Sequence, residues 1–245
     1  PAYRLTTHPK SREYRISPNG NDSNEGSLKR PFKTISAAAR IAMPGDTITV
    51  HDGTYREWVK PFKGGTSETK MITYRSAKRG KAIIKGSELI KTWKKVSPTV
   101  WMVSIENKFF GDYNPYQDLI HGDWFISKGK KHHTGEVYLN EKSMYEVDSL
   151  DKVLKPEKSK ETLDPEGSLF TWYCESNSRK TTIWANFHGK NPNDEQVEIN
   201  VRKSCFFPDR TGVNYIAVKG FRMCHAATQW APPTAEQTGL IGPNW

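Results

Sequence analysis

The sequence predicts an all-β protein, and three observations carry that prediction. One amphipathic helix lies near the N-terminus, and short strand-like runs follow it without another helix between them. Hairpin-like pairs of runs that alternate polar and apolar residues come later in the chain. The 18 Gly and 15 Pro fit many turns better than a helical bundle. We therefore expect a right-handed parallel β-helix with an N-terminal capping helix and an inserted antiparallel β-sandwich domain.

The helix is expected between Pro31 and the Pro44-Gly45 pair. Proline is favoured in the first turn of a helix, and a Pro-Gly pair ends one. The apolar residues between them recur at helical spacing on one face: Phe32, Ile35, Ala38, Ala39 and Ala42. A lone helix at the head of a strand-rich chain is typical of a cap over an open sheet end.

The first β-helix rungs are expected in residues 1–88, after the capping helix. Runs of β-branched residues occupy 47–59, 70–76 and 81–87, and only short turns separate them. Sequential strands of this kind indicate stacked solenoid rungs, although no exact repeat is visible.

Residues 89–204 have a different pattern. Residues 135–147 and 169–187 each read as a hairpin with a polar turn, and 195–202 alternates as a single strand. The charged stretch 148–168, which contains Pro and Gly, is expected to be a surface excursion. Period-two hairpins predict an inserted antiparallel β-sandwich.

The solenoid pattern returns in residues 205–245. Residues 213–223 resemble one rung, and a polar loop rich in Trp, Pro and Gly follows, after which the sequence ends. A solenoid needs several stacked rungs to bury a continuous core. We therefore expect a chain that stops in mid-solenoid, either as a fragment or as one that packs against another polypeptide.

Composition excludes some classes of partner. The formal net charge is +10, but the lysines are scattered among acidic residues, so nucleic acid is not expected. No apolar run approaches the roughly 18 residues of a membrane span, and no signal peptide is visible. The 3 cysteines lack disulfide or zinc spacing. These features leave the compartment open, with the cytoplasm favoured.

Several longer motifs resemble one known family. FFGDYNPY (109–116), HGDWF (121–125), VEINVRKSCF and VKGFRMCHAATQWAPPTAEQTGLIGPNW are similar to sequences of glycoside hydrolase family 120 β-xylosidases. The resemblance runs from about Tyr14 to Trp245. It implies a β-helix with a flanking β-sandwich, and a homo-oligomeric enzyme that needs no cofactor.

The resemblance also implies a reaction. Such enzymes hydrolyse β-1,4-xylo-oligosaccharides from the non-reducing end with retention, which needs two carboxyl groups roughly 5–5.5 Å apart. In the family these groups lie on later rungs, beyond the position of Trp245. We therefore expect this chain to be the N-terminal part of the enzyme and to lack the nucleophile and the acid/base.

Five residues are candidates for substrate binding. Trp124 follows a Gly-Asp turn, where its ring could stack on a sugar and reach a neighbouring subunit's site, and Asp123 could accept sugar hydroxyls. His225, Trp230 and Gln237 fall in the loop 224–239, and loops on rigid scaffolds concentrate binding residues. The alternatives are packing in the sandwich core for Trp124, turn capping for Asp123, and a loop packed against the sandwich domain for the other three.

Two other constellations favour structural roles. Asp52 and Glu57 are five residues apart, which places them on opposite faces of a strand. His132 and His133 with Glu136 imitate a metal site, but adjacent residues of an extended segment point apart, so no metal is expected.

Two further functions remain open at this point. The chain could be a non-catalytic carbohydrate-binding module, or a polysaccharide lyase that uses calcium on the same solenoid. The lyase would need acidic residues on successive rungs, and no such cluster is visible.

Overall fold

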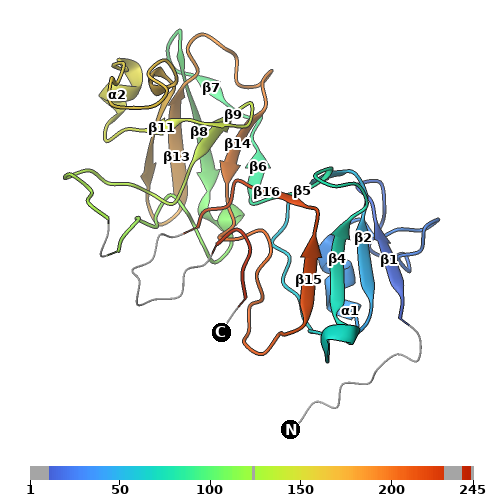
Figure 1. Cartoon of the computed structure of the whole chain (residues 1–245). Coiled ribbons are helices and arrows are strands. Elements are labelled where there is room, and N and C mark those ends of the chain that lie inside the picture. Colours follow the sequence, from blue (N-terminus) through green and yellow to red (C-terminus); the bar gives the residue numbers. More distant parts are fainter. Residues whose placement is uncertain (1–10, 123–124, 229–238, 244–245) are drawn as a thin grey trace. The chain divides into compact units, whose positions relative to one another are not determined.

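The computed structural model describes residues 11–122, 125–228 and 239–243. Within these residues the chain forms two compact units. Unit 1 contains residues 11–86, 204–224 and 239–243, and unit 2 contains residues 87–122, 125–203 and 225–228. Strands dominate both units and the helices are short, which confirms the all-β class (Figure 1).

Unit 1 is built from two parallel sheets. The first contains β1 (Glu13–Ile16), β2 (Thr47–Val50), β4 (Ile72–Ser76) and β15 (Ile216–Lys219), in that spatial order. The second contains β3 (Gly53–Tyr55), β5 (Ala82–Lys85) and β16 (Arg222–Cys224), with β5 in the middle. Every strand pair in both sheets is parallel.

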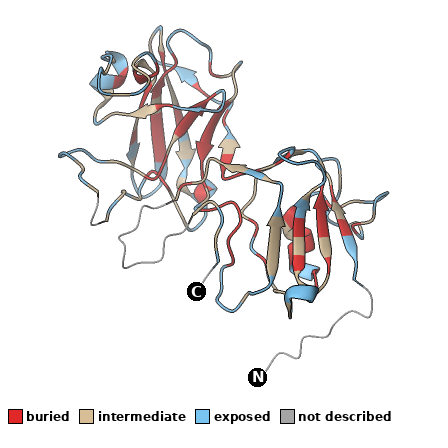
Figure 2. Cartoon of the chain, viewed as in Figure 1, coloured by how far each residue is buried: buried red, intermediate tan, exposed pale blue. Residues whose placement is uncertain are grey.

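The register of the first sheet stacks apolar side chains in a column. Tyr14 lies opposite Ile48, Ile48 opposite Tyr74, and Tyr74 opposite Val218. The first three of these side chains are buried, and the Tyr74 ring meets Phe206 edge-on, with the ring centroids 4.9 Å apart. Figure 2 shows buried residues along the strands of both units. Because side chains alternate across a strand, this face of the first sheet points into the core of the unit.

The expected helix is α1 (Ile35–Ile41), which packs beside β1 and β2. Thr34 caps it, since its hydroxyl oxygen accepts a hydrogen bond from the Ala37 N–H at 3.1 Å. Phe32 and Ala42, which the sequence pattern also placed on the apolar face, flank the helix and are buried. A short 3₁₀ turn, η1 (Glu68–Lys70), precedes β4.

Unit 2 contains two sheets. One has β10 (Lys142–Ser143), β9 (Val137–Leu139), β14 (Val197–Asn200) and β6 (Ser87–Leu89), in that order. The other has β11 (Tyr145–Glu146), β12 (Thr171–Ser176), β13 (Lys180–Asn186), β8 (Val100–Glu106) and β7 (Lys94–Lys95). Residues of both sheets meet in one hydrophobic core around Trp93, Trp172 and Phe187.

The hairpin predicted over 169–187 and the strand predicted in 195–202 are present, as β12 with β13 and as β14. In 135–147 a hairpin also forms, but its second strand is β10, whereas β11 of the same predicted hairpin lies in the other sheet. One expectation was wrong: the sandwich is not purely antiparallel, because β11 pairs parallel with β12. The chain passes directly from β10 in one sheet to β11 in the other.

The stretch 148–168 is more structured than an irregular excursion. It contains α2 (Leu150–Leu154) and enters η3 (Gly167–Leu169). Val153 of α2 is completely buried, and its carbonyl oxygen accepts a hydrogen bond from the Asn186 side chain at 2.8 Å. The remaining 3₁₀ turn, η2 (Asn107–Phe110), follows β8.

The unit boundary near the C-terminus differs from the one expected from the sequence. Residues 225–228 lie with unit 2, whereas the sequence pattern put all of 205–245 with the solenoid. The cause is local hydrogen bonding: the Ala227 N–H donates to Arg202 O at 2.7 Å, and Tyr113 Oη donates to Ala227 O at 3.0 Å. Within the described residues, no helix has the length and apolar character needed to cross a bilayer.

Candidate functional site

Four of the five binding candidates lie outside the described residues: Asp123, Trp124, Trp230 and Gln237. Their roles stay predictions. The fifth, His225, is described and belongs to unit 2.

His225 is held in a nearly buried polar cluster. Its Nδ1 lies 2.7 Å from Oε2 of Glu198, a carboxylate with no exposed surface, and its Nε2 lies 3.8 Å from Oε2 of Glu141. The ring stacks on Tyr138 with the centroids 3.8 Å apart. The Ser87 hydroxyl also approaches Nδ1, at 3.4 Å.

This cluster is not a nucleophilic triad. In a triad the hydroxyl and the carboxylate bond to different nitrogens of the imidazole. Here Ser87 and Glu198 share Nδ1, and Ser87 Oγ donates to Glu198 Oε2 at 3.2 Å. The geometry therefore gives His225 a place in the packing of unit 2, and its role in substrate binding stays a prediction.

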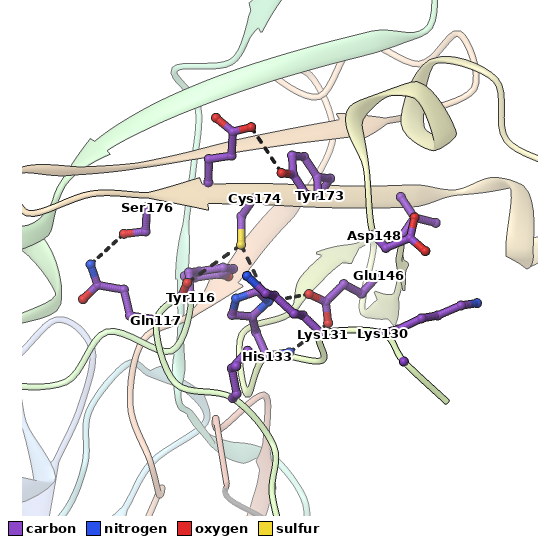
Figure 3. A pocket seen from close by; sticks show the side chains of 14 residues that line it. Tyr116, Gln117, Lys130, Lys131, His133, Glu146, Asp148, Tyr173, Cys174 and Ser176 are labelled. Carbon is purple, nitrogen blue, oxygen red and sulfur yellow. Dashed lines mark hydrogen bonds and ion pairs between the residues drawn. The ribbon is translucent and has the colours of Figure 1, made fainter. Parts of the chain in front are cut away.

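A hollow lies elsewhere in unit 2, beside β11 and β12 (Figure 3). Its volume is about 750 Å³, which is within the usual range of ligand sites. Tyrosines, charged residues and amides line it. The polar lining residues are Tyr116, Gln117, Lys130, Lys131, His133, Glu146, Asp148, Tyr173, Glu175 and Ser176.

An imidazole–carboxylate pair, His133 with Glu146, stands at this hollow (Figure 3). His133 Nδ1 donates to Glu146 Oε1 at 2.5 Å, and the His133 backbone N–H donates to Oε2 at 2.9 Å. Both side chains are mostly buried, at 15% and 13% exposed. A carboxylate oxygen can only accept, so Nδ1 carries a proton in this pair.

Cys174 lies next to His133. Its Sγ is 3.9 Å from His133 Nδ1 and 3.9 Å from Tyr116 O. Burial, followed by the charges of Glu146 and Glu175, raises the pKa of the Cys174 thiol to about 12. A thiol of that pKa stays protonated at neutral pH, so Cys174 cannot act as a nucleophile there.

Backbone hydrogen bonds hold the segment that carries His133. Residues 118–120 pair with residues 132–134: the Thr134 N–H donates to Asp118 O at 2.9 Å, and the Ile120 N–H donates to His132 O at 2.7 Å. Tyr113 Oη lies 2.9 Å from the Asp118 carboxylate. This pairing brings His133 next to Glu146, although turns separate the two residues in the sequence.

The residues considered for a metal site point to different partners. His133 faces Glu146, and the His132 ring meets Phe125 edge-on at 5.4 Å. Glu136 accepts a hydrogen bond from Ser143, and burial raises the pKa of its carboxyl group. Asp52 and Glu57 do not form an acid pair. The Asp52 carboxylate lies 3.4 Å from the Lys78 ammonium group, whereas the Glu57 carboxylate accepts a hydrogen bond from the first residue of α1.

Known proteins resemble this chain over both units. Residues 90–199 match the family described as "Glycoside hydrolase 120, insertion domain", and residues 18–61 match a family described as a protein of unknown function, DUF1565. A solved structure described as "The complex structure of XylC with xylose" is 50% identical, with a TM-score of 0.91. The match covers 95% of this chain and 38% of XylC.

A second similar protein comes from Bacillus subtilis (strain 168). This relative, "Uncharacterized protein YwoF", is 36% identical over 74 residues, which are 30% of this chain and 16% of YwoF. The present chain therefore spans well under half the length of either relative.

These likenesses and the two-unit all-β fold define a relative of the glycoside hydrolases. The resemblance to glycoside hydrolase family 120 is confirmed, and the residues of unit 2 from 90 to 199 match the model of that family's insertion domain.

Proposed function

We propose that this chain is the N-terminal part of a retaining, exo-acting β-xylosidase that hydrolyses β-1,4-xylo-oligosaccharides. The match to XylC carries the proposal: it is 50% identical over 95% of this chain, and XylC was solved with xylose. Because the match covers 38% of XylC, the two catalytic carboxylates are proposed to lie on later β-helix rungs outside this sequence.

The strands of unit 1 support the architectural side of the proposal. Two stacked parallel sheets, with α1 beside β1 and β2, are the arrangement expected at the capped start of a right-handed parallel β-helix. β15 pairs with β4 directly, so the strand after the insertion takes the next position in the same sheet. We propose that further rungs follow in the complete enzyme.

Substrate contacts within this chain are proposed at the five predicted residues, Asp123, Trp124, His225, Trp230 and Gln237. The proposed partners are the xylo-oligosaccharide, the rest of the enzyme and a second copy of it. No cofactor enters the proposed reaction, because two carboxyl groups and water suffice for a retaining glycosidase.

A chimera tests the proposal. This chain would replace the matching 38% of XylC, and release of p-nitrophenol from p-nitrophenyl β-xyloside would be measured for the chimera, for XylC and for the isolated chain. We expect turnover by the chimera and XylC, and none by the isolated chain. NMR of the first-formed sugar should show the β-anomer of xylose, because the mechanism retains configuration.

Two results would count against the proposal. Turnover by the isolated chain would refute the placement of the carboxylates on later rungs. A chimera that melts cooperatively, with a far-UV spectrum like that of XylC, yet cleaves no xyloside would refute the β-xylosidase assignment.

A further inference from the structure

The outer face of the five-stranded sheet of unit 2 carries a row of large side chains. Tyr173 of β12 lies opposite Trp184 of β13, and Trp184 lies opposite Met102 of β8. All three are partly exposed. Their neighbours along the strands, such as Trp172, Ile183 and Val103, point the other way into the core.

The planes of the two rings of this row are close to parallel. The centroids of Tyr173 and Trp184 are 6.0 Å apart and their planes are inclined by 27°. Cross-strand neighbours on a sheet hold each other in place, so the rings lose little entropy when a ligand settles on them. Flat aromatic faces of this kind suit the C–H face of a pyranose ring.

Polar groups surround the rings. Glu175, next to Tyr173 on the same face of β12, accepts a hydrogen bond from Tyr173 Oη at 3.2 Å and lies opposite Thr182. A hollow of about 310 Å³ beside Trp184 is lined by Met102, Glu175, Ser176, Asn177, Lys180 and Thr182. It shares Glu175 and Ser176 with the larger hollow at His133.

The charges of the two hollows balance. The lysines are Lys130, Lys131 and Lys180, and the carboxylates are Glu146, Asp148 and Glu175. Three cations against three anions favour neither a polyanion nor a cation. Interspersed donors and acceptors fit the hydroxyl groups of an uncharged sugar chain, which can serve as both.

α2 covers only part of this face. It contacts β12 and β13, and Asn186, at the end of β13, donates a hydrogen bond to it. Trp184, Thr182 and Lys180 precede Asn186 at alternate positions of β13 and line the smaller hollow.

We propose that this face is a saccharide-binding surface of the insertion domain, with Tyr173 and Trp184 as the stacking platform and Glu175 as an acceptor for sugar hydroxyls. Its ligand is an uncharged β-1,4-linked xylan chain, a choice of sugar that rests on the proposed function. A surface of this kind would hold polymeric substrate near the enzyme.

Native gel electrophoresis through soluble neutral xylan tests the proposal on the whole chain, and calorimetry with xylohexaose gives the affinity. We expect the wild-type chain to be retarded. We expect the double variant Tyr173→Ala/Trp184→Ala to bind xylohexaose about tenfold more weakly or worse, because loss of central aromatic contacts commonly costs that much. Tyr215→Ala, which removes a half-exposed tyrosine ring of unit 1, is the matched control and should bind like the wild type.

Glu175→Gln provides an independent variant, because it keeps the size of an exposed side chain and both rings. We expect it to bind several-fold more weakly while its thermal melt matches that of the wild type. The proposal is overturned if the wild-type chain shows no retardation, if folded Tyr173→Ala/Trp184→Ala is retarded normally, or if polygalacturonate binds more tightly than xylan. Xylan binding is measured without turnover, so failure of the chimera to cleave a xyloside would not change the result of the binding test.

Discussion

Glu57 and Ile35 are joined across unit 1 by a hydrogen bond that starts a helix. Glu57 Oε1 accepts from the Ile35 N–H at 2.9 Å, and Oε2 accepts from the Ser36 N–H at 2.8 Å. The first N–H groups of a helix have no partner within it. A distant carboxylate therefore completes α1 and ties it to the segment after β3.

Replacing Glu57 by Ala should lower the free energy of unfolding by about 2–3 kcal/mol, because two charge-assisted hydrogen bonds to backbone donors are lost. Urea denaturation followed by circular dichroism measures this loss. Asp52→Ala is the matched control: it removes an exposed ion pair with Lys78 and should cost at most about 0.5 kcal/mol. Equal losses for the two variants would contradict the capping role of Glu57.

The His133–Glu146 pair should be energetically coupled. A double-mutant cycle with His133→Ala and Glu146→Ala should give a coupling free energy of about 1–3 kcal/mol, as expected of contacting residues that are mostly buried. The Lys190–Glu195 pair, which is 47% and 28% exposed, should couple by less than about 1 kcal/mol in the same experiment. If the coupling free energy of His133 with Glu146 is no larger than that of the control pair, the His133–Glu146 contact does not stabilise the fold.

The raised pKa of Cys174 should make stability fall in alkali. Its folded pKa of about 12 lies above the ordinary value for a thiol, so the folded state keeps a proton that the unfolded state loses. The stabilisation is complete below pH 8 and is lost as the pH rises towards 12. The slope from this group reaches about 1.4 kcal/mol per pH unit.

Denaturation curves between pH 8 and pH 10.5 check this sign. Cys174→Ala should show a shallower decline than the wild type, whatever its stability at pH 8. Cys224→Ala, which removes the partly exposed cysteine, should keep the wild-type slope. A slope unchanged by Cys174→Ala would show that other groups cause the alkaline loss.

Gly64 should tolerate no side chain. A Cβ at this position would lie 2.0 Å from the carbonyl oxygen of Asn214, which belongs to the backbone and cannot turn away. Gly64→Ala should therefore cost about 3 kcal/mol or more, measured by thermal unfolding. At Gly80 a Cβ meets nothing within 4 Å, and Gly80→Ala should cost only about 1 kcal/mol, the strain of its positive φ. Reversal of this order would contradict the close approach at Gly64.

Local patterns in the sequence predicted much of the fold. The spacing of apolar residues between Pro31 and Pro44 was sufficient for α1, and alternation was sufficient for β12, β13 and β14. The direction of β11 was not predictable, because two residues carry no periodicity and only their pairing with β12 defines it. α2 was missed because its five residues are too few for a helical pattern.

The site was harder to predict than the fold. His133 was considered as a metal ligand with its neighbours in sequence, but its partner, Glu146, is brought in by strand pairing. The Tyr173–Trp184 pair was within reach of sequence reasoning, since a hairpin over 169–187 brings the two strands together. What the sequence could not supply was the register of that hairpin, which decides which residues share the outer face.

The direct pairing of β4 with β15 has a consequence for synthesis of the protein. β4 can pair along this edge only after β15 has been synthesised, because Ile216, the partner of Ile72, comes about 140 residues later in the chain. At translation rates of roughly 5–20 residues per second, the edge of β4 stays open on the ribosome for on the order of ten seconds. Neighbouring nascent chains could add a strand there during that time, so the insertion carries a kinetic risk of aggregation that the finished sheet does not show.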